Sequence, residues 1–210
     1  MDPGTARERR HFLIEMTLRR ARPGTGSSME FYRRRDWSTL GVDLTSIRTP
    51  FAIVGAIATR LYMPERVTHD IDLFVHADDR HTLARELVEH GFAKHGELSI
   101  GGSTWVGAAG EVLDVIESND PWARDAIVSA NRAPDGSPVI GLPYLVLLKL
   151  RASRFQDTAD VSKMLGLASE ENLDQVREVI AKYQSEDRED LESLITLGRI
   201  EFGADDTSVH

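Results

Sequence analysis

The chain has 210 residues, of which 41% are hydrophobic and 28% charged, and this composition is typical of one globular domain or of a core domain with a small addition. No run approaches the roughly 18–20 apolar residues that a membrane span needs, and the first residues lack the pattern of a secretory signal, so we expect no membrane partner. The absence of cysteine excludes disulfides, thiolate metal sites and a cysteine nucleophile, and it fits the reducing cytoplasm in which we expect the protein to act.

The net charge is −9 and the pI is near 5.3, which predicts a poor general binder of nucleic acid. Residues 1–28 are the exception, because they carry an excess of arginine and end in a Gly/Ser-rich stretch. We interpret residues 1–28 as a flexible basic extension that does not pack on the rest of the chain. A short basic helix that binds nucleic acid or a partner protein is the alternative.

From residue 29 onward the hydrophobic pattern predicts strands interleaved with helices, followed by helices alone. We expect helices at 31–40, 56–63, 78–91, 121–132, 142–153, 157–166, 171–184 and 189–202, strands at 50–55 and 68–76, and a hairpin of strands at 97–107 and 111–117. The fold class is therefore α+β with a mixed β-sheet. We place the sheet core at 29–133, a C-terminal helical region at 134–203 and a tail at 204–210.

Three carboxylates in this pattern point to a metal site. Asp70 and Asp72 are two residues apart on one predicted strand, so their side chains leave the same face. Asp114 stands alone among apolar residues in a later strand, where a bare charge needs a partner. Side-by-side carboxylates repel each other unless a cation lies between them, and hard oxygen ligands suit Mg²⁺, with Mn²⁺ as a substitute. Such a set serves phosphoryl and nucleotidyl transfer.

Residues just before these acids predict a phosphate-binding turn. Gly55 ends a strand and Ala56 opens a helix, whose free backbone N–H groups suit the triphosphate of an NTP. Arg66 and Thr68 lie in the connection that leads to the acids, where we expect them to reach the nucleotide.

The segment from Gly55 to the D-I-D at 70–72, with the later Asp114, resembles the nucleotidyltransferase fold of the DNA polymerase β superfamily. The motif R-x-T-x-D-I-D at 66–72 resembles that of the bacterial branch that includes abortive-infection and toxin–antitoxin nucleotidyltransferases. The later segment LPYLVLLKLRASRFQDTADVSKML also resembles that branch. The resemblance covers about residues 50–166.

This resemblance implies a Mg²⁺-dependent transfer of NMP from an NTP to an acceptor hydroxyl, with Asp70, Asp72 and Asp114 as catalytic metal ligands. It also implies that Lys149 binds the triphosphate, although a surface lysine on an amphipathic helix is an equal alternative. The acceptor, which the sequence does not identify, is a tRNA, a protein or a small molecule, and a cognate partner protein is possible in a toxin–antitoxin or phage-defence setting.

Ala56 departs from this resemblance, because the family usually has Gly or Ser there, and a serine hydroxyl for the phosphates is lost. This departure favours an alternative function, in which a protein of the same fold binds a nucleotide or a toxin–antitoxin partner without catalysis. A structural protein whose acids are incidental is a third possibility, and it predicts no stabilisation by metal.

Overall fold

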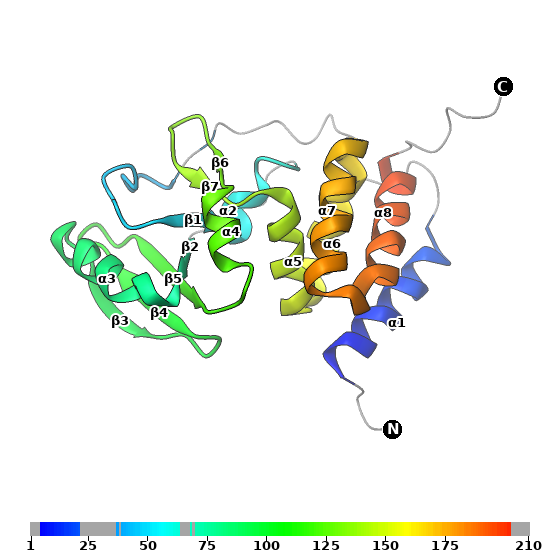
Figure 1. Ribbon diagram of the computed structural model, residues 1–210, viewed down its shortest axis with the longest axis horizontal. Coiled ribbons are helices and arrows are strands. Elements are labelled where there is room, and N and C mark those ends of the chain that lie inside the picture. Colours follow the sequence, from blue (N-terminus) through cyan, green and yellow to red (C-terminus); the bar gives the residue numbers. More distant parts are fainter. Residues whose placement is uncertain (1–4, 22–36, 38, 64–67, 69, 203–210) are drawn as a thin grey trace. The chain divides into compact units, whose positions relative to one another are not determined.

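The computed structural model describes residues 5–21, 37, 39–63, 68 and 70–202, which form two compact units (Figure 1). One unit comprises residues 34–61 and 65–141 and contains the β-sheet; the other comprises residues 1–33, 62–64 and 142–210 and is helical. The predicted α+β class, the mixed sheet and the group of helices at the C-terminal end are confirmed. Most of the helix expected at 31–40 falls outside the described residues.

The sheet unit is built on seven strands in the order β3-β4-β5-β2-β1-β7-β6. Its centre is apolar, since β1 is buried throughout and β2 buries four of its seven residues. The strands are β1 (Phe51–Val54), β2 (Asp70–His76), β3 (Ala93–Glu97), β4 (Gly102–Val106), β5 (Val112–Ser118), β6 (Asn131–Arg132) and β7 (Pro138–Val139). The hairpin expected from the sequence is confirmed, because β4 and β5 pair antiparallel.

Pairing between the strands is mixed. β2 runs antiparallel to β1 and parallel to β5, and β1 also runs parallel to β7. In the parallel pair, Asp72 lies directly opposite Asp114, and the next pair on the same face is Phe74 and Ile116. Residues at these positions point to one face of the sheet, and those between them, such as Leu73 and Val115, point to the other.

The described residues of the sheet unit form the α-helices α2 (Gly55–Thr59), α3 (Arg80–Glu89) and α4 (Ala123–Val128). Leu83 and Leu87, which are four residues apart on α3, are both fully buried, as expected for the apolar stripe of a helix that covers a sheet. Trp122 precedes α4 and stacks on Phe74, with ring centroids 5.3 Å apart. This aromatic pair closes the core on the sheet face that carries Asp72.

The helical unit consists of α1 (Ala6–Leu18), α5 (Leu142–Ala152), α6 (Phe155–Leu167), α7 (Glu170–Tyr183) and α8 (Arg188–Phe202). Helices α6 and α8 cross so closely at Gly166 and Gly198 that a Cβ on Gly198 would lie 2.1 Å from the carbonyl oxygen of Ser162. Glycine is therefore required at this crossing, since any side chain would push the two backbones apart.

The first helix differs from the flexible extension that we expected for residues 1–28. Thr5 caps α1 through a reciprocal pair of hydrogen bonds with Glu8. Ile14 is 1% exposed, and Arg10 is buried against Asp187 and Asp190 near the start of α8. Arg10 and Asp190 lie 180 residues apart in the sequence, so no local pattern reveals their contact. A helix thus forms over residues 6–18, and its binding to nucleic acid or a partner protein stays a prediction.

None of the described helices combines the length and the apolar character that crossing a membrane requires.

Candidate active site

The structure brings the three predicted acids together on one face of the sheet. Asp70 and Asp72 come from β2, and Asp114 comes from the adjacent strand β5. Each of them offers a carboxylate oxygen, and these three oxygens all lie within 4.8 Å of one another. None of the three residues is fully buried. Three carboxylate oxygens at this spacing form a donor set that suits a hard divalent cation such as Mg²⁺ or Mn²⁺.

Gly55 makes room for the central carboxylate. Its φ is +66°, and a Cβ built on it would lie 1.8 Å from Oδ2 of Asp72. The register explains this approach, because Val54 is the partner of Asp72 on the neighbouring strand and Gly55 follows at the strand end. A glycine is therefore needed here for two reasons, the left-handed backbone and the carboxylate beside it.

Two threonine hydroxyls orient the other two carboxylates. Thr68 donates a hydrogen bond to Oδ1 of Asp70, and Thr104 on β4 donates one of 2.6 Å to Oδ1 of Asp114. We expected Thr68 to contact the nucleotide, and the structure shows its hydroxyl on Asp70. Thr104 was missed, because its place opposite Asp114 depends on the register of β4 against β5, which the sequence alone does not determine.

Sequence reasoning also expected Ala56, Arg66 and Lys149 to bind the nucleotide. Ala56 is the second residue of α2, a helix of only five residues, and its backbone role stays a prediction. Arg66 lies outside the described residues. Lys149 lies in the other unit, on α5, with a side chain that is 7% exposed, and its Nζ contacts Asp157 and Asp160 at 2.8 Å each. The alternative of a surface lysine is wrong, and a role in NTP binding stays a prediction.

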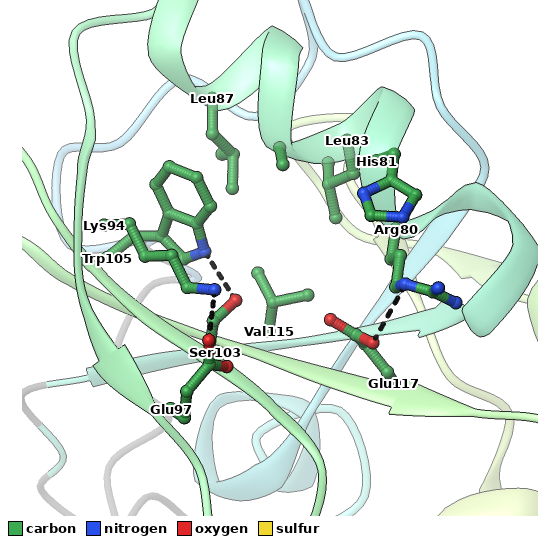
Figure 2. A pocket seen from close by; sticks show the side chains of 11 residues that line it. Arg80, His81, Leu83, Leu87, Lys94, Glu97, Ser103, Trp105, Val115 and Glu117 are labelled. Atoms are coloured by element: carbon green, nitrogen blue, oxygen red, sulfur yellow. Dashed lines mark hydrogen bonds and ion pairs between the residues drawn. The ribbon is translucent and has the colours of Figure 1, made fainter.

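The opposite face of the same sheet has a cavity of about 310 Å³ under α3 (Figure 2). Apolar side chains line it on both sides, with Leu83 and Leu87 on α3 and Val115 on β5. Figure 2 shows Trp105 with Lys94 and Glu97 on one side, and Arg80 with Glu117 on the other. Both charged pairs are ion pairs, at 2.5 Å and 3.9 Å. Cations and anions are thus balanced here, in contrast to the three acids on the other face.

Comparison with known proteins gave matches among solved structures alone. No family model matches the chain, and no curated protein matches it. Two of the similar solved structures are a crystal structure of ANT(2'')-Ia in complex with adenylyl-2''-tobramycin and a solution structure of the antibiotic-resistance factor ANT(2'')-Ia. Each is 20% identical to this chain and covers 71% of it, with 87% and 82% of the other chain covered and a TM-score of 0.38.

A likeness of this size transfers no residue's role to the present chain, so the functional assignment rests on the arrangement of its own side chains.

Proposed function

We propose that the protein is a metal-dependent nucleotidyltransferase that moves an NMP from an NTP to an acceptor hydroxyl. The observation that carries the proposal is the convergence of Asp70, Asp72 and Asp114, whose carboxylate oxygens lie within 4.8 Å of one another at one face of the sheet. Three like charges at such short range repel one another, and a cation that joins them relieves this repulsion.

The donor set fits Mg²⁺ or Mn²⁺, because all three side chains offer hard carboxylate oxygens. Asp70, Asp72 and Asp114 would hold the metal together with the phosphates of the NTP. A bound divalent cation supplies electrostatic stabilisation of the charge that builds on the phosphate oxygens.

Asp114 has a second task in the proposal, since it orients the acceptor hydroxyl and accepts its proton. The acceptor oxygen then forms a bond to the α-phosphorus, the bond from that phosphorus to the bridging oxygen breaks, and pyrophosphate leaves. The backbone of Gly55 and Ala56, together with Arg66, Thr68 and Lys149, is proposed to bind the triphosphate. The hydroxyl of Thr68 also donates a hydrogen bond to Asp70, so we propose that it orients that carboxylate as well.

The acceptor is proposed to be an RNA, a protein or a small molecule, in a toxin–antitoxin or phage-defence setting where a partner protein is also expected. A large RNA needs a basic surface, and the chain as a whole carries −9. The arginines that would supply such a surface, Arg33, Arg34 and Arg35, lie outside the described residues. If the protein binds RNA weakly and this affinity falls steeply with salt, an RNA acceptor is favoured. If the protein does not bind RNA, a protein or a small-molecule acceptor is favoured.

Transfer of label from each of four α-labelled NTPs tests the proposal directly. The wild-type protein, incubated with Mg²⁺ and a cell extract, should label one class of acceptor from one preferred NTP. Asp72→Asn should abolish the labelling, because it removes the central metal ligand. Glu178→Gln changes an acid on α7, outside the proposed site, and serves as the matched control that should label as wild type does.

Thermal unfolding separates the enzyme from its alternatives. Mn²⁺ with NTP should raise the Tm of the wild-type protein through linkage, and Asp72→Asn should lose most of this rise. A rise without any transfer of label would support the nucleotide-binding protein that lacks catalysis. Equal Tm values with and without metal and NTP would show that the acids are incidental and would overturn the proposal.

A further inference from the structure

Thr104 contacts the site from a strand that contributes no acid to it. It lies on β4 directly opposite Asp114, and its hydroxyl donates a hydrogen bond of 2.6 Å to Oδ1 of that residue. We propose that Thr104 is a positioning residue, which holds the Asp114 carboxylate in the orientation that binds the metal. This inference rests on the proposed function and extends it to a residue outside the acid motif.

The need for such a donor follows from the charges of the site. Before a cation binds, repulsion from Asp70 and Asp72 favours rotation of the Asp114 carboxylate away from them. A hydrogen bond from a fixed donor opposes this rotation. Threonine suits the task because its β-branched side chain is stiff at χ1, so the hydroxyl itself has little freedom.

The arrangement of β4 argues that the hydroxyl serves the carboxylate rather than the core. Thr104 is half-buried, and its two neighbours, Ser103 and Trp105, are buried on the opposite face. Ser103 accepts a hydrogen bond from Nε1 of Trp105 at 2.9 Å. The strand therefore carries two hydroxyls one residue apart, of which one faces the acids and the other faces the core.

Mn²⁺ affinity, measured by electron paramagnetic resonance on the full chain without nucleotide, provides the test. Thr104→Val keeps the shape of the side chain and removes the donor, and we expect it to weaken Mn²⁺ binding about tenfold, as is usual for a partner of a metal ligand. Thr104→Ser keeps the hydroxyl and should stay within about twofold of wild type. Ser103→Ala removes the neighbouring hydroxyl from the other face and should also bind Mn²⁺ within about twofold of wild type.

A double-mutant cycle distinguishes positioning from a structural effect. Thr104→Val should have no further effect on Mn²⁺ affinity in the Asp114→Asn background, because the hydroxyl acts only through that carboxylate. Equal and additive losses in both backgrounds would overturn the inference, as would wild-type affinity in Thr104→Val. If Thr104→Val fails to fold, as judged by circular dichroism, Thr104→Ala takes its place in the same cycle.

The two proposals fail in different ways. If neither the wild-type protein nor Asp72→Asn binds Mn²⁺, both the proposed function and this inference are overturned. Binding by wild type that is lost in Asp72→Asn and kept in Thr104→Val would overturn the role of Thr104 alone.

Discussion

The carboxylates of the two units have neighbours of opposite charge. In the helical unit, the buried acids lie beside cations: Asp187 and Asp190 contact Arg10 at 2.6 Å and 2.8 Å, and Lys149 contacts Asp157 and Asp160. In the sheet unit, Asp70, Asp72 and Asp114 lie beside one another; Thr68 donates a hydrogen bond to Asp70, and Thr104 donates one to Asp114.

This difference indicates which charges stabilise the fold and which serve chemistry. Removing one partner of a buried ion pair destabilises a protein strongly. The paired acids of the helical unit therefore contribute to the stability of the fold. Like charges that converge reduce stability, so the sheet acids are explained better by a ligand that they share. The four predictions below test this contrast, starting with the largest expected effect.

Removal of the buried cation should have the largest effect. Arg10→Met removes the buried guanidinium that contacts both Asp187 and Asp190, and we expect it to lower the free energy of unfolding by about 3–5 kcal/mol in urea titrations. Arg7→Met is the matched control, because Arg7 contacts the same Asp187 while its own side chain is 55% exposed. It should cost less than about 1 kcal/mol. Similar costs for both variants would remove the contrast between the units.

Gly55→Ala should damage the acid site more than the fold. The new Cβ meets Oδ2 of Asp72, so the carboxylate must move, and we expect Mn²⁺ affinity to fall at least about tenfold. Gly91→Ala provides the control, since its φ is +85° and nothing lies within 4 Å of the position of its Cβ. Both variants carry backbone strain of about 1–2 kcal/mol, which thermal unfolding measures. Unchanged Mn²⁺ affinity in Gly55→Ala would show that the contact with Asp72 is unimportant for binding.

The cavity on the other face of the sheet should accept a larger side chain. Ala84 lines it, and Ala84→Leu adds apolar atoms to a space of about 310 Å³. We expect a gain in stability of about 0.5–2 kcal/mol, seen as a higher Tm, and no change in Mn²⁺ affinity. Ala84→Ser adds a single atom and should give no gain. A lower Tm for the leucine variant would mean that α3 packs best with the cavity open.

The smallest expected effect is a pH dependence in the helical unit. A hydrogen bond to Asp190 raises the pKa of His11 above its ordinary value of 6.5. A raised pKa in the folded state means that His11 stabilises the fold fully below pH 6.5 and that this contribution is lost as the pH rises through the raised value.

The contribution of His11 is below about 1 kcal/mol, because its side chain is 44% exposed. Urea titrations at pH 5.5 and 8.5 should therefore show a modest loss of stability with pH in wild type, which is smaller in His11→Gln. An equal change in both proteins would assign the pH dependence to other groups.

The sequence predicted the acid site better than its surroundings. The period-two alternation of a strand placed Asp70 and Asp72 on one face, and the apolar neighbours of Asp114 identified it as the third member. The antiparallel pairing of β4 and β5 followed from a tight turn between two strand patterns. These signals are local, and each depends on a few consecutive residues.

Other features had no local signal. The sequence of β3 is AKHGE, which has no apolar alternation, and the two-residue strands β6 and β7 are too short to form a pattern. The pairing of Arg10 with Asp187 and Asp190 joins the two ends of the chain, so it requires the tertiary fold. The contact between Gly55 and Asp72 depends on strand register, which a single sequence does not determine.

The packing of α1 on α8 also determines what a shorter translation product would lose. In the full chain, the side chains of Asp187 and Asp190 are 1% and 4% exposed and contact Arg10. A product that starts at the internal methionine, Met29, would lack Arg10, so these two acids would lose the cation that neutralises them. The surface that Ile14 covers would open to water at the same time. Such a product would unfold more often, and cellular proteases remove chains that do so.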